Sequence, residues 1–160
     1  MEIRVQNIQE ITLLSVEEAN RLSKSDRTID GWWWLRSPGK PHHHAAFVNY
    51  NGEISSFGTP VTRDYGCVRP ALRISCFPPN LTVGSKTELF GCCWTKISRD
   101  LLLCDTSVGT TAFHELVLDP NPNEFETSDI RVWLNKWLES QPKMKELRDL
   151  HNRVEAMWKD

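Results

Sequence analysis

Residues 32–39 read Trp-Trp-Trp-Leu-Arg-Ser-Pro-Gly, a run of indoles that stops at a Pro-Gly break. Bulky aromatic side chains favour a β-strand, here over residues 31–36, and the Pro-Gly pair predicts where it ends. Because strand side chains alternate, Trp32 and Trp34 should face one side and Trp33 the other. We expect at least two of these indoles in the core. Trp32 is the candidate for an exposed indole that stacks on a sugar, a base or a partner side chain.

The chain around this strand alternates short apolar runs with turn signals, which predicts further strands. The pair Asn51-Gly52 between two apolar runs predicts a tight hairpin in which both turn residues take positive φ. Upstream, Ser15 with Glu18 three residues later forms a capping box and predicts a helix to about residue 22 or 23. Pro70 places its strand at an edge or a bulge. The expected strands cover residues 10–14, 31–36, 45–50, 53–57, 66–75, 88–97 and 101–105, and polar loops cover 25–30, 58–65 and 107–123.

Two helices are predicted at the end of the chain. The first starts near Thr127 or Ser128 and places apolar residues at helical spacing. The second starts at Pro142, a residue that suits the first helical turn. Its apolar stripe is expected to face the core and its mixed charges to face solvent. Trp158, at its end, is a candidate anchor for a second subunit or a partner. The stripe consists of Met144, Leu147, Leu150, Val154 and Met157.

Length and composition limit the class of protein. The 160 residues suit a single domain, residues 1–160, long enough to bury a core without metal or disulfide. Seven Trp and a hydrophobic fraction of 39% exclude an intrinsically disordered chain. The net charge of -2, without a basic patch, argues against nucleic acid as a direct ligand. No apolar run approaches the roughly 18 residues of a membrane span, and the first ten residues lack a secretory signal. We therefore expect no membrane association and a cytoplasmic protein whose five cysteines are reduced thiols.

Several motifs resemble a domain family of unknown function found in gut bacteria and their phages. The combination of WWLRSPG with a later G-x-VRPAL is far more specific than one short motif. In the first half the matching motifs are LLSVEEA at 13–19, WWLRSPG at 33–39, AAFV at 45–48 with Asn51-Gly52, and CVRPAL at 67–72. In the second half they are Phe90-Gly91 with Trp94, LLLC at 101–104 and SDIRVWLN at 128–135.

The order of the two halves is reversed relative to that family, which implies a circular permutation. Residues 1–75 correspond to its C-terminal half and residues 86–160 to its N-terminal half, so that 75–85 would bridge the original ends. Permutation requires those ends to lie close in space. The family resembles the C-type-lectin-like fold. This implies an α+β domain with a twisted, mainly antiparallel sheet, two to three helices and long loops that bind protein or carbohydrate.

Candidate binding residues come from the matched motifs and from the loops beside them. Arg36 and Arg69 are each expected to be a buried fork that hydrogen-bonds loop carbonyls or a carboxylate, with Asp129 or Glu18 as partner. The alternative is an anion site that uses both guanidiniums. The loop at 40–44, Lys-Pro-His-His-His, departs from the Ser- and Asn-rich pattern of the family. The candidate ligand-binding residues are Trp32, Arg36, Lys40, His42, His44, Arg63 and Tyr65.

No metal, cofactor or catalytic site is predicted. Only His42 and His44 share one side of an extended loop, and no neighbouring residue completes the ligand set of zinc. Cys92 and Cys93 should face opposite sides of a strand. Buried, inert thiols are favoured, with a thiol cluster that includes Cys104 as the weaker alternative. No local signature frames a nucleophile with its base, and no phosphate-binding or dinucleotide-binding motif occurs.

These observations favour a non-enzymatic binding module that recognises a protein partner through the loops at 37–44, 58–65 and 107–123. Three alternatives stay open. A small inhibitor of a host defence nuclease, of the anti-CRISPR kind, fits the association of the family with phages. A carbohydrate-binding, lectin-like module is the second. The third is a thiol-dependent enzyme, for which the cysteines at 92, 93 and 104 are the candidates.

Overall fold

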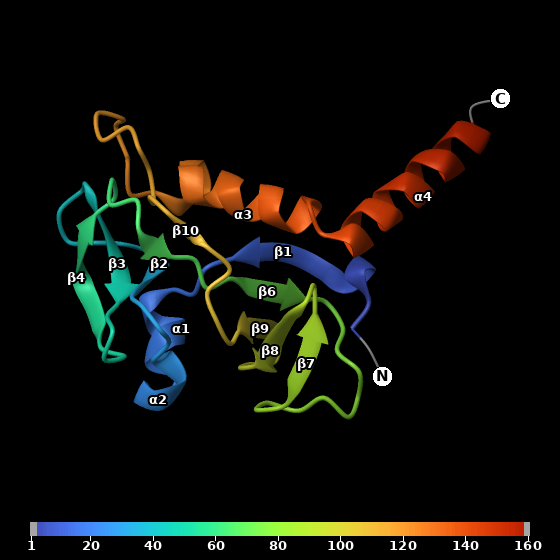
Figure 1. The fold of residues 1–160 in the computed structure, drawn as a ribbon, viewed down its shortest axis with the longest axis horizontal. Coiled ribbons are helices and arrows are strands. Elements are labelled where there is room, and N and C mark those ends of the chain that lie inside the picture. Colours follow the sequence, from blue (N-terminus) through green and yellow to red (C-terminus); the bar gives the residue numbers. More distant parts are fainter. Residues whose placement is uncertain (1–2, 159–160) are drawn as a thin grey trace.

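The described part of the chain forms two five-stranded sheets and four α-helices, which confirms an α+β fold (Figure 1). The computed structural model describes residues 3–158. The first sheet has the order β1 (Ile8–Thr12), β6 (Ala71–Ile74), β9 (Leu101–Cys104), β8 (Cys92–Lys96) and β7 (Lys86–Leu89). The second has the order β10 (Thr110–Thr111), β5 (Gly66–Cys67), β2 (Trp33–Pro38), β3 (His44–Val48) and β4 (Ile54–Pro60). The helices are α1 (Val16–Asn20), α2 (Lys24–Arg27), α3 (Asp129–Glu139) and α4 (Pro142–Trp158), with 3-10 turns η1 (Val5–Asn7) and η2 (Phe125–Thr127).

Strands from the two halves of the chain share both sheets. In the first sheet β1 and β6 come from the first half and β7, β8 and β9 from the second, and the pairing β6–β9 joins them. In the second sheet β10 from the second half pairs with β5 from the first. All strand pairs are antiparallel except β2 with β5. The permuted order of the halves stays a prediction.

The local signals decide most element boundaries. Ser15 caps α1 as expected, because its Oγ accepts from the Glu18 N–H at 3.1 Å and the Glu18 carboxylate accepts from the Ser15 N–H at 2.9 Å. The predicted loop over 25–30 is partly wrong, since residues Lys24–Arg27 form one helical turn. A second cap explains this turn: the Ser23 hydroxyl accepts from the N–H of Asp26.

The tight-turn prediction is placed at the wrong pair of residues. At Asn51-Gly52 only the glycine has positive φ, and the Asn49 side chain bonds the N–H groups of Asn51 and Glu53 instead. The two-residue turn with positive φ at both positions is Phe90-Gly91, with φ of 57° and 71°. It splits the predicted strand 88–97 into the hairpin of β7 and β8, in which Leu89 pairs with Cys92.

The tryptophan strand lies between two hydrophobic clusters. Trp32 and Trp34 belong to one cluster and Trp33 and Leu35 to the other, which confirms the predicted alternation. The indole N–H groups are satisfied: Trp33 donates to the carbonyl of Arg27 and Trp34 to that of Thr111, each at 2.9 Å. Most of the indole area of this strand therefore serves packing.

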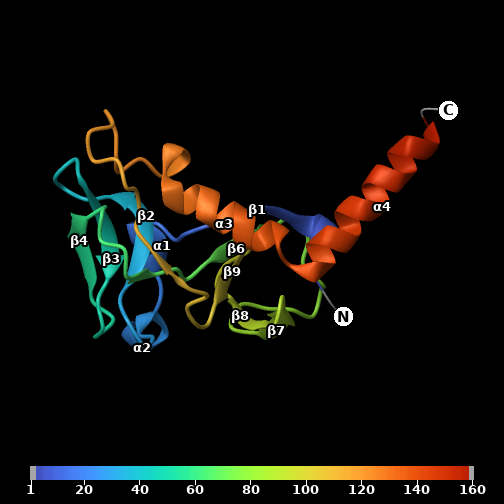
Figure 2. The ribbon, with the colours of Figure 1, turned by 45° about the horizontal axis from the view of Figure 1, so that its top comes forward.

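The two C-terminal helices have different surroundings. α3 buries Ile130, Leu134 and Leu138 against the core, as its spacing predicts. α4 extends away from the body of the molecule (Figures 1 and 2), and none of the residues over Pro142–Trp158 is buried. The prediction that its apolar stripe is core holds only for Met144, which is partly buried against the core, and is wrong for Leu150, Val154 and Met157, which are exposed. Within residues 3–158, no helix has the length and apolar character needed to span a membrane.

Candidate functional site

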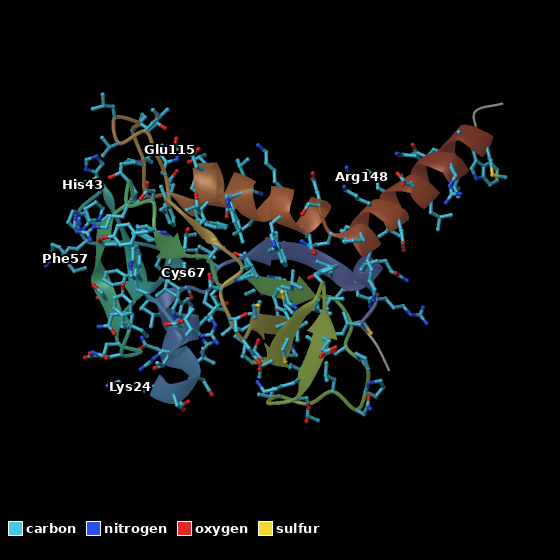
Figure 3. The ribbon with its side chains drawn as sticks, viewed as in Figure 1. Lys24, His43, Phe57, Cys67, Glu115 and Arg148 are labelled. Carbon is cyan, nitrogen blue, oxygen red and sulfur yellow. The ribbon has the colours of Figure 1, made fainter. Side chains whose placement is uncertain are left out.

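Three loops meet at one end of the second sheet. We call this the three-loop surface and define it as residues 39–43, 61–65 and 114–123. The Val61 N–H donates to the carbonyl of His43 at 3.0 Å, and the His114 N–H donates to the carbonyl of Val61 at 3.1 Å. Figure 3 shows His43 and Glu115 at this same end of the molecule, far from Lys24. Backbone hydrogen bonds thus hold the three loops in a fixed relation.

Asn123 ties the third loop to the first. Its side-chain amide donates to the carbonyl of His44 at 3.0 Å and to that of Pro41 at 3.4 Å, and the residue is buried. A buried amide with both contacts formed gives a specific junction, since losing one partner would leave a polar group unsatisfied. Residues some eighty positions apart in the chain are joined here.

His114 holds the base of the third loop. The ring is 6% exposed; its Nδ1 accepts from the N–H of Asp129 at 3.2 Å, and its Nε2 lies 2.6 Å from Asp119 Oδ2. Acceptance at Nδ1 defines the neutral tautomer with its proton on Nε2, which donates to Asp119. The carboxylate of Asp129 accepts from the N–H of Glu115 at 2.9 Å. Both ends of the segment 115–119 are therefore fastened.

The fastened segment exposes a run of apolar side chains. Leu116 is 64% exposed, Val117 41% and Leu118 95%, while Tyr65 in the neighbouring loop is 53% exposed. An isolated exposed leucine is common on protein surfaces, but a contiguous apolar group usually marks an interaction site. The three-loop surface carries charges of both signs: Lys40 and Arg63 are cationic, and Asp64 and Glu115 are anionic.

The structure brings most of the predicted binding residues to this surface. Lys40 and His42 are exposed on the first loop, and Arg63 and Tyr65 on the second, where the Arg63 guanidinium donates to the Tyr65 hydroxyl at 2.9 Å. His44 opens β3 at the edge of the surface, half-buried, with its ring 5.3 Å from that of Phe57. The backbone bonds from Val61 to His43 and from His114 to Val61 bring the segments that carry these side chains beside the loop of the apolar run.

Trp32 does not present its indole to solvent. It is only 7% exposed, and the edges of Trp34, Phe47 and Tyr65 surround its ring at centroid distances of 4.8, 5.3 and 5.7 Å. The expectation of an exposed stacking platform is wrong. The side of the strand that carries Trp34 faces the core, so its neighbour two positions away is buried with it. Tyr65 covers the indole and is itself the exposed aromatic.

Arg36 and Arg69 are both structural forks. Arg36 donates to the carbonyl of Leu13 at 2.7 Å and pairs with Glu18. Arg69 is buried, donates to the carbonyls of Cys104 and Asp26, and stacks over the Trp33 ring at 4.9 Å.

Burial lowers the pKa of Arg69 to about 10, although nearby Asp105 acts in the opposite direction. The side chain still carries its charge at neutral pH. Its two carbonyl bonds and the aromatic contact fit a role as a tie between α2, β9 and the tryptophan strand. Asp129, the other predicted partner, contacts His114 instead.

A second polar cluster lies on the first sheet. Lys86 Nζ is 2.6 Å from Asp105 Oδ2, and the Thr95 hydroxyl donates to the other carboxylate oxygen at 2.6 Å. Cys93 is exposed beside this cluster. Burial of the sulfur and a hydrogen bond with Asp105 raise the pKa of the Cys93 thiol. A raised pKa disfavours the thiolate, which is the nucleophilic form of a cysteine.

The remaining thiols and histidines form no closed metal site. Burial raises the pKa of Cys104 to about 11, and its neighbour Cys92 acts in the same direction. Among residues 3–158, no three His, Cys, Asp or Glu side chains are grouped closely enough to hold a metal ion. The Nδ1 of His44 is the one buried side-chain nitrogen or oxygen without a hydrogen-bond partner in the described part of the chain.

The sequence interpretation missed the side chains that dominate the face. It included the loop 107–123 but selected no residue from it. The apolar triplet Leu-Val-Leu at 116–118, inside a polar segment followed by prolines at 120 and 122, was the available signal. The role of His114 cannot be derived from its neighbours in sequence, because a turn brings Asp119 to its ring and the start of α3 brings Asp129.

The comparisons with known proteins concern the first half of the chain. The family described as Domain of unknown function (DUF6273) matches residues 5–76, a stretch that runs from η1 to just beyond β6. This supports the resemblance to an uncharacterised domain family over that stretch. No curated protein matches the chain. No solved structure matches it either, and the likeness to C-type lectins stays a prediction.

Proposed function

We propose that the protein is a non-enzymatic binding module that recognises a protein partner through the three-loop surface. The observation that carries this proposal is the exposed run Leu116–Leu118, held at both ends by His114, Asp119 and Asp129. Side chains that are apolar, exposed and fixed bind with little loss of conformational freedom. Tyr65 adds an aromatic group with a polar tip, which suits protein interfaces.

The surroundings of the apolar run fit a protein better than a small molecule. The loops carry exposed charges of both signs, Lys40, Arg63, Asp64 and Glu115, in addition to the apolar run, and charged and apolar groups together are typical of protein interfaces. Two pockets of the described residues, one beside α4 and one between α1 and the loop 97–101, are lined by no residue of the three-loop surface. The exposed apolar run is therefore the feature of this surface that supports macromolecular recognition.

The test compares three proteins immobilised and incubated with lysate of the natural host. Leu118→Asp places a charge at the most exposed apolar position of the run. Val83→Asp is the matched control, because Val83 is 62% exposed in the connector before β7 and lies outside the three-loop surface. We expect mass spectrometry to identify a protein that the wild type and the control retain and that Leu118→Asp loses. Equal recovery by all three proteins, or recovery of no protein, contradicts the proposal.

An inhibitor of a host defence nuclease is a special case of this proposal. It rests on the resemblance to a family from gut bacteria and phages, and it requires a cytoplasmic protein. Its test asks whether the retained protein is a nuclease and whether stoichiometric addition of the module stops its cleavage. A lectin-like role would instead give binding on a glycan array that Tyr65→Ala abolishes and Leu118→Asp leaves intact.

A further inference from the structure

α4 carries an apolar stripe that no residue of the described part of the chain, 3–158, buries. Leu147, Leu150, Val154 and Met157 follow one another at intervals of three, four and three residues, the spacing of a two-heptad coiled-coil seam. Leu150 is 52% exposed, Val154 43% and Met157 78%, and Trp158 beside them is 85% exposed. Figures 1 and 2 both show the helix leaving the body after its first turns.

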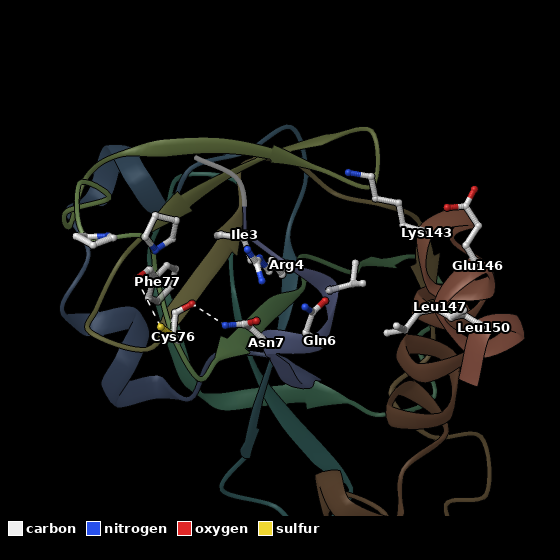
Figure 4. Close-up of a pocket in the computed structure, with 13 residues that line it drawn as sticks. Ile3, Arg4, Gln6, Asn7, Cys76, Phe77, Lys143, Glu146, Leu147 and Leu150 are labelled. Atoms are coloured by element: carbon white, nitrogen blue, oxygen red, sulfur yellow. Dashed lines mark hydrogen bonds between the residues drawn. The ribbon is translucent and has the colours of Figure 1, made fainter. Parts of the chain in front are cut away.

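The base of the same helix borders a groove. Its volume is about 850 Å³, and Figure 4 shows α4 on one side and the N-terminal segment with the loop 76–79 on the other. The α4 side contributes Lys143, Leu147 and Leu150. The opposite side contributes Ile3, Arg4 and Phe77. The apolar stripe therefore begins inside the groove and continues past it into solvent.

We propose that α4 pairs antiparallel with α4 of a second copy of this chain, so that the C-terminal end of each helix lies in the groove of the other. In this register Leu147 meets the partner's Met157 and Leu150 meets the partner's Val154. A twofold axis then passes near Asn152, and the same contacts form twice, as a twofold dimer requires. The groove and the exposed end of the helix are thus the two halves of one self-complementary surface.

Charge favours the antiparallel arrangement. The last carbonyls of a helix carry a partial negative charge, and the proposed pairing brings them to the groove of the partner. Arg4 and Lys143 provide two cationic side chains there against one carboxylate, that of Glu146, so the cationic groups are in excess. The length of α4 also favours a partner helix. A helix of 17 residues with little tertiary packing is only marginally stable in water, and pairing along the apolar stripe would stabilise it.

The size of the seam sets the strength of the dimer. Two heptads alone form an interface at the small end of the range for specific complexes, and the groove enlarges it. We expect a reversible dimer whose population depends on concentration. Near the axis Arg153 faces its own counterpart, and these like charges oppose association.

Sedimentation of the full chain over a range of concentrations tests the pairing. Val154→Glu puts a charge into the seam, and Ala156→Glu puts the same charge on the opposite face of α4. We expect Val154→Glu to raise the dimer dissociation constant at least about tenfold. Ala156→Glu should leave it unchanged, and Arg153→Gln should lower it. Circular dichroism checks that α4 stays helical in each variant.

A monomer at every concentration, with α4 helical, overturns the proposal. Equal effects of the two glutamate variants overturn it as well, and so does a stripe that binds only lipid vesicles. The orientation has its own test. A photoreactive phenylalanine in place of Trp158, in a mixture of isotopically light and heavy chains, should cross-link to residues 3–7, 76–79 or 143–147 of the other copy. Cross-links between the two positions 158 would show a parallel pair and refute the antiparallel one.

Discussion

The ring of His114 and the carboxylate of Asp119, 2.6 Å apart, close the short segment that displays Leu116, Val117 and Leu118. Between them the chain makes a turn, with the Asp119 N–H donating to the carbonyl of Leu116 at 3.1 Å. The histidine is buried and the aspartate is half-buried. The contact therefore anchors a surface loop, an element that is usually more mobile than strands and helices, to the core of the protein.

Replacing Asp119 should loosen this loop without unfolding the protein. We expect Asp119→Ala to cost at most about 1 kcal/mol of the free energy of unfolding, because a partly exposed hydrogen bond contributes little net stability. The amides of residues 115–119 should exchange with solvent faster, and capture of the partner should weaken. Hydrogen exchange with mass spectrometry measures the first effect. The control is Asp64→Ala, on the neighbouring loop; unchanged exchange over 115–119 in Asp119→Ala would refute the anchoring role.

Gly66 is a position where the tryptophan core allows no side chain. A Cβ added there would lie 2.3 Å from Trp34 Nε1 and 2.7 Å from an atom of the Trp32 ring. Both rings are buried and packed, so neither can move aside cheaply. We expect Gly66→Ala to destabilise the protein by about 3 kcal/mol or more. Denaturant unfolding gives the value. Gly84→Ala isolates the other cost of replacing a glycine: nothing lies within 4 Å of its added Cβ, but its φ of 95° strains an alanine, so we expect a smaller loss of about 1–2 kcal/mol there. Equal losses in the two variants would contradict the steric reason.

The fold class and the site could be predicted to different depths. Periodicity placed the strand with Trp33 and Trp34, the capping box placed α1, and apolar spacing placed α3, because each depends on neighbours in sequence. The chemistry of turns was less decisive: Phe90 adopts positive φ although its residue type does not favour it, while its ring packs against the core and lies 6.2 Å from that of Trp137. Tertiary packing overrides the local preference there.

Burial could not be derived from spacing alone. The stripe of α4 has the same period as that of α3, yet α3 buries its stripe in the core, whereas α4 has no buried residue and packs only Met144 against the core. The spacing of apolar residues shows that one face of a helix is apolar. It does not show whether another part of the same chain covers that face. For the site, loop ranges could be predicted from composition, but the junctions of His114 with Asp129 and of Asn123 with His44 join distant segments, and only the fold brings them together.

Acid should weaken the protein through Glu18. Partial burial raises the pKa of this carboxyl, but bonds from Arg36 and the Ser15 N–H outweigh it and hold the pKa below 4.5. The folded state thus binds its proton less readily than the unfolded state. The resulting stability is fully present above pH 4.5 and is lost as the pH falls through the folded pKa.

Unfolding at several pH values should show this. Glu18→Gln should be less stable than the wild type at pH 7, and the difference should shrink on acidification. Glu17→Gln is the matched control, since Glu17 is exposed in the same helical turn. A difference between wild type and Glu18→Gln that stays constant down to about pH 3 would show that the ion pair does not carry the effect.

The thiols should differ in reactivity by their surroundings. Cys104 is fully buried, and burial raises its pKa to about 11, so at pH 8 almost none of it is thiolate. Cys93 is exposed, but partial loss of hydration at its sulfur and a hydrogen bond with Asp105 raise the pKa of its thiol. Cys76 is exposed beside the groove. We expect iodoacetamide to modify Cys76 first, Cys93 more slowly, and Cys104 only after unfolding, as measured by mass spectrometry over time.

The same residues separate a binding module from a thiol enzyme. Cys93→Ala and Cys104→Ala remove the two thiols whose surroundings oppose ionisation, so neither should change capture of the partner. Cys104→Ala should lower stability, because it leaves a small cavity under Trp94, its cross-strand neighbour. Rapid alkylation of Cys93 or Cys104 in the folded protein, together with loss of function in the corresponding variant at unchanged stability, would support thiol chemistry and overturn the non-enzymatic assignment.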